Sequence, residues 1–340
     1  MNSISLRDGL TALVATFVCV GVFQWYARRR NLVDVPVERS SHTAPTPSSG
    51  GVGIAAGVLT AVAVQASDFD GWSFAIALLF GLAAMAGFVD DVRGMNARQK
   101  LAVLVSLSMP LAAFCARDQV GGVPFVGKVE LGSWGGFAGA LLCLTLYPNA
   151  FNFMDGIDGI AALTGVVTGT AFAVAGYWHG DLFLAQWGAV AAGASLGFLP
   201  WNFPRARIFM GDAGSLPLGL LLILCAMKAS TSNALPLPAS ILLLGPFLFD
   251  VTFTLFRRWR EGKTIGEAHK EHLYQRLSRL WGSHAKVSLL YATLSLVTGG
   301  LALTYASMSD AGKLLSLVVP LAAMLGFAAL VLRAERRKGV

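Results

Sequence analysis

Charged side chains are scarce in this sequence of 340 residues. Asp, Glu, Lys and Arg together make up 13% of the chain, about half the usual share in soluble proteins. Hydrophobic residues make up 55%, and the mean hydropathy is +0.63. A soluble domain of this size cannot bury so much apolar surface, and disordered chains have the opposite composition. The composition therefore predicts an integral membrane protein that lies almost wholly in the bilayer.

Cysteine is also rare, and an internal repeat is absent. Cys19, Cys115, Cys143 and Cys225 all lie in or at the end of apolar stretches, and none forms a CxxC pair. This spacing excludes a disulfide framework and a cysteine-based zinc site. The lack of a visible repeat argues against a transporter built from inverted repeats.

Eleven apolar segments suit membrane helices, which need roughly 20 apolar residues each. The predicted spans are 9–27, 50–66, 72–89, 101–116, 134–148, 160–178, 182–199, 215–229, 238–256, 287–306 and 314–332. The ninth contains Pro246 and Asp250, so we expect a kink there. The sequence thus predicts an all-α polytopic membrane protein, with one catalytic domain over residues 1–340. A ten-span arrangement with one re-entrant segment is the alternative.

The basic residues predict how the chain is oriented. With the N-terminus outside and the C-terminus inside, 21 of the 26 Lys and Arg residues fall in inside segments. This matches the positive-inside rule, and the reverse orientation violates it in nearly every loop. Arginines follow the first apolar run, which is typical of a retained helix rather than a cleaved signal. The longest outside loop, 117–133, alternates weakly and predicts a small β-hairpin.

Acids, amides, histidines and glycines gather in the inside loops. Asp90 and Asp91 stand where an apolar segment meets such a loop. Adjacent carboxylates repel each other unless a cation is near, so the pair is a candidate for metal binding or proton transfer. The alternative is a pair of solvated acids at a helix end, balanced by Arg93 and Lys100.

Asn149, Asn152, Asp155 and Asp158 recur at every third position. On a helical stretch, side chains at this spacing share one face. Oxygen ligands of this kind suit Mg²⁺ or Mn²⁺ better than zinc. The alternative is an Asx-rich turn and N-cap before the next span.

A Gly-Asp-Ala-Gly-Ser segment, residues 211–215, directly precedes another span. Glycines at a helix N-terminus bind phosphate oxygens well, and Asp212 is a candidate metal ligand. The alternative is an ordinary loop cap. Phe209 either packs in the core or provides a ring on which a base stacks.

The inside loop 257–286 is long and basic, and it contains His269 and His272. On a helix these histidines share a face with Arg276, a combination that suits an anionic phosphate. The alternative is an amphipathic helix lying on anionic lipid. Asp250, inside a span, is either functional or a buried partner of an arginine. His284 shows no such pattern and is interpreted as an ordinary residue.

Taken together, these loops resemble the polyprenyl-phosphate N-acetylhexosamine-1-phosphate transferases, glycosyltransferase family 4. The motifs RSSH…PTP, DD, NxxNxxDGxDG, GDxGS and the histidine loop stand in the family's order across residues 36–280. The stretch 269–286, HKEHLYQRLSRLWGSHAK, looks most like the branch that initiates O-antigen and related surface polysaccharides. The alternative branch is the phospho-MurNAc-pentapeptide transferase of peptidoglycan synthesis.

The resemblance implies a role for each candidate residue. Asp212 binds the catalytic Mg²⁺ or Mn²⁺ with Asn152 as second ligand, and Asp90 and Asp91 lie by the attacking lipid phosphate. In the donor site, Asp155 and Asp158 shape the pocket, Phe209 stacks on uracil, and Thr46 lies at the pocket edge. The residues that contact the diphosphate and the sugar are Lys100, His269, His272 and Arg276. Asn149 is a further substrate contact.

The implied reaction is transfer of HexNAc-1-phosphate from a UDP-N-acetylhexosamine to undecaprenyl phosphate, with release of UMP. Asp90 then acts as a base or positions the acceptor, the alternative being a covalent nucleophile. We expect a bacterial inner-membrane protein with a periplasmic N-terminus, a cytoplasmic C-terminus and a cytoplasmic active site. Its partners are the two substrates and membrane lipid, with no nucleic acid; a homodimer is an open alternative to a single chain. The rival classes are an ion-coupled transporter or flippase and a membrane-bound scaffold.

Overall fold

The computed structural model describes residues 3–34, 44–64, 71–115, 120–123, 127–130, 132–264, 266–267 and 269–338. These residues form an almost entirely helical bundle, which confirms the all-α membrane fold. The helices are α1 (Ser3–Arg29), α2 (Gly51–Val64), α3 (Gly71–Arg93), α4 (Ala97–Cys115), α5 (Gly132–Phe153), α6 (Ile160–His179), α7 (Leu182–Asn202), α8 (Asp212–Thr231), α9 (Leu237–Leu243), α10 (Gly245–Arg260), α11 (Leu273–Trp281), α12 (His284–Thr304) and α13 (Asp310–Lys338).

Each of the eleven predicted spans overlaps a helix, and the ninth overlaps two. Among the described residues, seven helices are long and apolar enough to cross a membrane, or eight if α9 and α10 form one span. α9 and α10 are bent by 79° relative to each other, which confirms the predicted kink. Pro246 stands in the first turn of α10, where a proline is tolerated. α2 has only 14 residues, about 21 Å, so it is shorter than the bilayer core.

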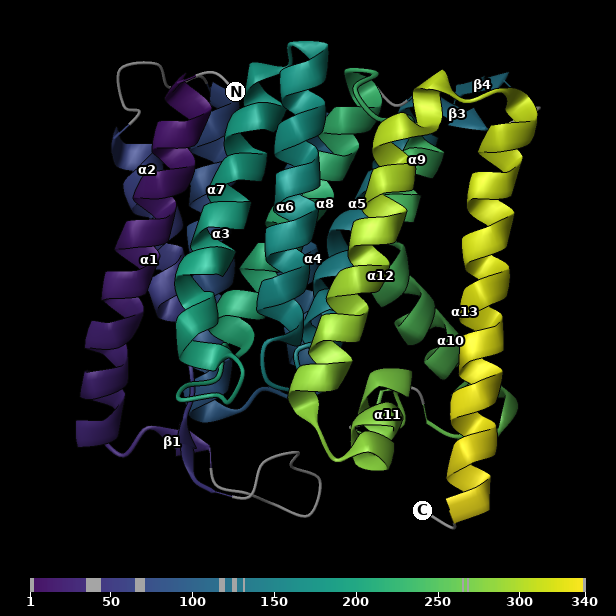
Figure 1. The fold of residues 1–340 in the computed structure, drawn as a ribbon. Helices are drawn as coiled ribbons and strands as arrows, with labels where there is room; N and C mark the ends of the chain where they lie inside the picture. The colour runs from purple at the N-terminus through teal and green to yellow at the C-terminus, as the bar shows by residue number, and fades with distance from the viewer. Residues whose placement is uncertain are drawn as a thin grey trace.

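The long helices run side by side, with α1 and α2 at one edge of the bundle and α13 at the other (Figure 1). Two short antiparallel ribbons lie at opposite ends. β1 (Val33–Asp34) pairs with β2 (Thr46–Pro47) at the lower end. β3 (Val120–Val123) pairs with β4 (Gly127–Glu130) near α9 at the upper end, which confirms the predicted hairpin.

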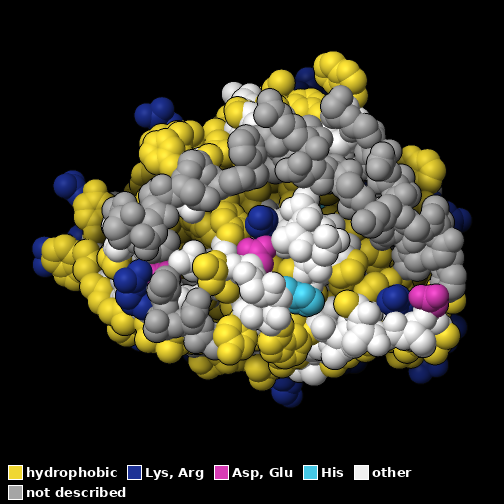
Figure 2. Space-filling model, turned by 90° about the horizontal axis from the view of Figure 1, so that it is seen from above, with side chains coloured by type: hydrophobic (Ala, Val, Ile, Leu, Met, Phe, Trp, Pro, Cys, Tyr) yellow, Lys and Arg dark blue, Asp and Glu magenta, His cyan; other side chains and the backbone are white. Residues whose placement is uncertain are grey.

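The two ends of the bundle differ in charge. Three helices, α1, α10 and α13, reach the lower end with basic last turns, which contain Arg28, Arg29, Arg257, Arg258, Arg260, Arg336, Arg337 and Lys338. Figure 2 shows the upper end, where the charged side chains in view are few and scattered among hydrophobic and uncharged ones. Basic residues therefore concentrate at the end that also holds α11.

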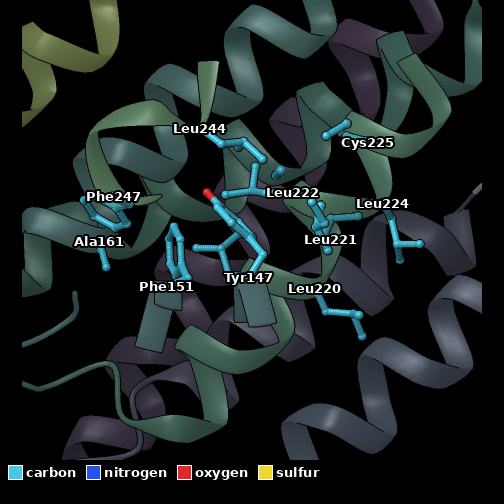
Figure 3. Packing of buried hydrophobic residues seen from close by; sticks show 14 of the residues in the cluster. Tyr147, Phe151, Ala161, Leu220, Leu221, Leu222, Leu224, Cys225, Leu244 and Phe247 are labelled. Carbon is cyan, nitrogen blue, oxygen red and sulfur yellow. The ribbon is translucent and has the colours of Figure 1, made fainter. Parts of the chain in front are cut away.

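Aromatic rings and leucines pack α5, α8 and α10 together (Figure 3). The Phe151 ring lies 6.2 Å from the Tyr147 ring and 5.3 Å from the Phe247 ring, measured between centroids. All three side chains are buried. Because lipid tails are as apolar as these side chains, close packing rather than removal from water holds such helices together. This packing fixes the lower ends of α5 and α8 relative to each other.

Glycines let α2 and α3 cross the first turn of α8 at very short range. A Cβ at Gly51 would lie 2.0 Å from the backbone nitrogen of Gly214. A Cβ at Gly87 would lie 2.1 Å from the carbonyl oxygen of Asp212. Only a residue without a side chain allows these approaches, as is typical of helix contacts in membranes. The last turn of α3 therefore lies directly against the start of α8.

Replacing Gly87 with alanine is expected to destabilise the bundle by about 1–3 kcal/mol, because the new methyl group must push α3 away from α8. The matched control is Gly81→Ala on the same helix, where a Cβ would make an ordinary contact 3.8 Å from Leu59 Cδ1. Thermal unfolding in detergent measures both. Equal midpoints for the two variants would contradict the close crossing.

Candidate active site

Four helix ends meet at the lower end of the bundle and bring polar side chains together. α3 ends with Asp90 and Asp91 in its last turn, and α5 ends one residue after Asn152. α4 carries Lys100 in its first turn, and α8 begins at Asp212. We call these five residues the carboxylate cluster. They come from four separate segments of the sequence, and the fold makes them neighbours.

Lys100 joins two carboxylates of this cluster. Its Nζ lies 2.8 Å from Oδ2 of Asp212 and also forms an ion pair with Asp90. Asp90 is only 6% exposed, so its interpretation as a solvated acid at a helix end is wrong, although the expected partner Lys100 is present. A buried carboxylate without a cation is strongly destabilising. Lys100 therefore compensates charge on two separate helices.

Asp212 has a partner on each carboxylate oxygen. Oδ2 faces Lys100, and Oδ1 accepts a hydrogen bond from Nδ2 of Asn152 at 2.8 Å. The same amide nitrogen also donates to Oγ of Ser215, one turn further along α8. Ser215 in turn donates to the carbonyl oxygen of Gly211. These bonds tie the end of α5 to the start of α8.

Asp91 caps the N-terminus of α8. Its Oδ1 accepts from the backbone N–H of Asp212 at 2.8 Å, and its Oδ2 accepts from that of Ala213 at 3.2 Å. Gly211 has a φ of 69°, and a Cβ there would lie 2.4 Å from the Asp91 carboxylate. Ser49, whose φ is 65°, also hydrogen-bonds Asp91. Asp91 thus positions Asp212 through the backbone.

The turn between α5 and α6 contains Asp155 and Asp158. α5 ends at Phe153, so the prediction that all four Asn and Asp residues share one helical face is wrong beyond that point. Asn149 donates to the carbonyl oxygen of Thr145 within its own helix. The aspartates lie instead in a turn that closes at a glycine in the left-handed region, Gly159, with φ 81°. The predicted alternative of an Asx-rich turn describes this segment better.

Asp155 experiences the negative charge of the whole site. Desolvation, together with the carboxylates of Asp212, Asp91 and Asp158, raises the pKa of Asp155 well above its usual value. A like charge disfavours ionisation, and a nearby cation restores it. Burial and the three neighbouring carboxylates therefore both disfavour the charged form of Asp155.

Asn202 connects this turn to the segment that contains Phe209. Its Oδ1 accepts from the backbone N–H of Gly159 at 2.7 Å, and its Nδ2 donates to the carbonyl oxygen of Ile208 at 2.9 Å. The backbone N–H of Phe209 donates to the carbonyl oxygen of Pro47 in β2, next to Thr46. Thr46 and Phe209 are both partly exposed. Two predicted donor-site residues thus lie on neighbouring segments.

Asp250 organises the histidine segment. It accepts hydrogen bonds from the backbone N–H groups of Leu273 and Tyr274 and from the Tyr291 hydroxyl. Its Oδ1 also lies 3.3 Å from Nδ1 of His272, which is 3% exposed. Asp250 therefore caps α11 rather than pairing with an arginine. The Tyr274 hydroxyl donates to the Phe153 carbonyl, so that α11 lies against the turn that follows α5.

His269 and Arg276 belong to the same segment, and both are partly buried. The rings of His269 and His272 are 5.0 Å apart between centroids. Desolvation, His272 and Arg258 lower the pKa of His269 to about 4, so the ring is neutral near pH 7. Arg276 forms ion pairs with Glu271 and with Glu335 of α13. A cavity of about 670 Å³ opens beside His269, and its lining is mainly charged: Arg258, Lys263, Glu267, Lys270, Glu271 and Arg279.

Sequence reasoning missed His284, Asn202 and Ser49. His284 begins α12, and its Nδ1 lies 3.3 Å from Oδ1 of Asp158. No spacing rule links position 284 to position 158, and Asn202 lies just after the predicted span 182–199, outside the motifs. Ser49 precedes two glycines, which was the only local signal of an unusual backbone there.

The donor atoms of the cluster suit a hard divalent cation. Asp212 has two carboxylate oxygens, and Asn152, whose amide nitrogen donates to one of them, also carries an amide oxygen; oxygen ligands of both kinds suit such a cation. Within the described part of the chain, no group of three His, Cys, Asp or Glu residues is arranged to hold a metal. Mg²⁺ is commonly bound through one or two carboxylates together with water and substrate phosphates, and this cluster fits that pattern.

Comparison with known proteins gives a consistent result. The sequence model of a family described as glycosyl transferase family 4 matches residues 73–230, a range that includes the whole carboxylate cluster. The chain is 32% identical over 329 residues to the decaprenyl-phosphate N-acetylglucosaminephosphotransferase of Mycobacterium leprae, covering 87% of this chain and 82% of that protein.

Two further relatives have different names. The chain is 29% identical over 280 residues to a probable undecaprenyl-phosphate N-acetylglucosaminyl 1-phosphate transferase of Bacillus subtilis, covering 81% of this chain and 77% of that protein. It is 30% identical over 277 residues to the phospho-N-acetylmuramoyl-pentapeptide-transferase of Streptococcus pneumoniae, covering 75% of this chain and 81% of that protein.

Proposed function

Since the chain belongs to glycosyl transferase family 4, we propose that it transfers N-acetylhexosamine 1-phosphate from a UDP-sugar to undecaprenyl phosphate and releases UMP. The family membership makes it a multi-pass membrane phosphoglycosyltransferase. The names of the Mycobacterium leprae and Bacillus subtilis relatives support a polyprenyl-phosphate acceptor and an N-acetylglucosamine donor.

The observation that carries the proposal is the bridge that Lys100 makes between Asp90 and Asp212. The reaction brings together two anions, a lipid phosphate and a nucleoside diphosphate, so fixed cations must offset their repulsion. Lys100 provides such a cation in the first turn of α4, at the lower, basic end of the bundle. A lipid acceptor needs this location, because its chain stays in the bilayer while its phosphate reaches the surface.

In the proposed transfer, an oxygen of the lipid phosphate attacks the β-phosphorus of the UDP-sugar. The bond from that phosphorus to the bridging oxygen breaks, and UMP leaves with the oxygen. A phosphate monoester has a second pKa near 6, so the acceptor is mostly dianionic at pH 7. Asp90 therefore removes a proton only from the minor monoanionic form, and its main role is to hold Lys100 beside the acceptor phosphate.

The other cluster residues position the donor diphosphate. Asp212 would hold Mg²⁺, together with the amide oxygen of Asn152 after that side chain turns, because its amide nitrogen faces Asp212 in this structure. The bound ion would supply positive charge to the diphosphate oxygens. Asp91 keeps Asp212 in place by capping α8. We assign Phe209 to stacking on uracil, with Thr46 at the edge of that pocket.

The remaining donor contacts come from the turn after α5 and from the histidine segment. Asp155 and Asp158 line the nucleotide side, and His269 and Arg276 face the sugar and diphosphate. We assign His272 a supporting role, because its buried ring contacts Asp250 at the cap of α11. We assign Asn149 an indirect role in substrate binding, because its amide donates to the carbonyl oxygen of Thr145 within α5.

We propose the first membrane step of O-antigen or a related surface polysaccharide as the biological role, on the basis of the stretch 269–286. The peptidoglycan reaction is the second candidate, because the Streptococcus pneumoniae relative is 30% identical over most of both chains. The basic last turns of α1, α10 and α13 support a cytoplasmic site and C-terminus in a bacterial inner membrane, with the N-terminus periplasmic.

The test is UMP release by the purified protein in detergent with undecaprenyl phosphate and Mg²⁺. Each reaction contains one donor, taken from UDP-GlcNAc, UDP-GalNAc and UDP-MurNAc-pentapeptide. The proposal expects UMP only when lipid, cation and a HexNAc donor are all present. Release with the pentapeptide donor alone would move the assignment to the peptidoglycan reaction. No release with any donor, in protein that remains monodisperse, would overturn the proposal.

A further inference from the structure

His284 and Asp158 form a contact that links α12 to the turn after α5. The ring nitrogen Nδ1 of His284 lies 3.3 Å from Oδ1 of Asp158 and 3.4 Å from the backbone nitrogen of the same residue. An unprotonated Nδ1 accepts from the backbone N–H, and a protonated Nδ1 donates to the carboxylate. In either form the ring is fixed to Asp158 and to no other acid among the described contacts.

The backbone of this turn is already held by other bonds. Ser288, one turn further along α12, donates to the carbonyl oxygen of Asp158 at 2.7 Å. Asn202 accepts from the N–H of Gly159. The main chain therefore has its own supports, and His284 is the described residue that contacts the Asp158 carboxylate. Its contact restricts where that side chain points.

The carboxylate lies at the edge of the proposed donor site. Its side chain is 15% exposed, and that of His284 is 22% exposed, so both border open space. Through Asn202, the turn is joined to the segment that ends at Phe209. Asn202 thus holds the backbones of the two segments together, and a carboxylate on this turn can accept from N–H or O–H groups of a nucleoside bound there.

We propose that His284 is a positioning residue for the nucleoside part of the donor. Its imidazole holds the Asp158 carboxylate in the orientation that accepts from the N–H of the pyrimidine ring. This inference rests on the proposed function, because it assumes a uridine nucleotide at this site. The effect is on binding rather than on chemistry, since the nucleoside lies apart from the reacting phosphorus and binds equally in the ground and transition states.

The test compares His284→Leu with His284→Asn, measuring UMP affinity by titration and donor KM and kcat by UMP release. We expect His284→Leu to weaken UMP binding and raise donor KM about tenfold, with kcat within about twofold of wild type, since a hydrogen bond to a charged group is lost. His284→Asn keeps a polar group near the position of Nδ1 and restores most of the affinity.

The control for helix stability is Ser283→Ala. Ser283 is the N-cap of α12, and its Oγ accepts from the N–H of Lys286 without touching Asp158. This variant lowers the thermal midpoint and leaves donor KM unchanged. If His284→Leu behaves in the same way, the residue is only structural and the inference is wrong.

A double variant tests whether His284 acts through Asp158. In an Asp158→Asn background, His284→Leu is expected to weaken UMP binding no further. Independent, multiplicative losses would overturn the inference. Failure of the proposed function looks different, because wild-type protein would then neither bind UMP nor release it from any donor.

Discussion

Replacing Asp212 with asparagine is expected to reduce turnover by about 10³-fold or more while the protein still inserts into the membrane. Asp212 is the residue on which the site converges, since its carboxylate contacts Lys100 and Asn152 at 2.8 Å each. Asparagine keeps the shape of the side chain but removes its charge. Both the partner of Lys100 and the proposed ligand of Mg²⁺ are lost together.

The matched control for this variant is Asp310→Asn. Asp310 is also the first residue of a long helix, α13, but its side chain is 80% exposed. UMP release, normalised to monodisperse protein in detergent, measures both variants. We expect the control to retain wild-type turnover. An Asp212→Asn protein with turnover near wild type would remove Asp212 from the mechanism.

Replacing Lys100 with methionine is expected to lower kcat/KM by about 10²–10³-fold. Methionine preserves much of the volume of the side chain but leaves Asp90 and Asp212 facing each other without their shared cation. Two anionic substrates must then approach a cluster that is more negative by one charge. The repulsion between the substrates and the cluster opposes both substrate binding and the transition state. We therefore expect KM to rise and kcat to fall.

Arg98→Met is the matched control for Lys100→Met. Arg98 lies two residues earlier on the same helix and is exposed, so its removal changes the net charge equally without touching the cluster. Equal losses in the two variants would mean that general surface charge, rather than the bridge, supports activity. A large loss only at Lys100 supports the assignment.

The helices could be predicted from the sequence because each apolar run is set apart by a polar or glycine-rich loop. Pro246 indicated the break that separates α9 from α10. The ends of the helices were less accurate, since α5 stops at Phe153 where the spacing of Asn and Asp residues suggested a continuous face. The three-residue spacing of Asn and Asp is equally compatible with a turn. Gly156 and Gly159, which follow the two aspartates, favour the turn.

The motifs identified which loops form the site, but the contacts between them depend on packing. The contact of Asp91 with the backbone of Asp212 arises because Gly87 allows α3 to meet α8 closely, which no local pattern encodes. The sequence leaves Asp250 open between a functional and a structural role, and the fold shows that it caps α11. The sequence does not single out His284, because its partner Asp158 is 126 residues away.

The most direct test of the central claim is to follow the β-phosphate. UDP-N-acetylhexosamine labelled with ³²P at the β-phosphorus is incubated with the purified protein, undecaprenyl phosphate and Mg²⁺, and the lipid is then extracted. Phosphoglycosyl transfer predicts that the label enters the lipid fraction in step with UMP release. Label that remains in the aqueous fraction as UDP, while the sugar enters the lipid, would contradict the account.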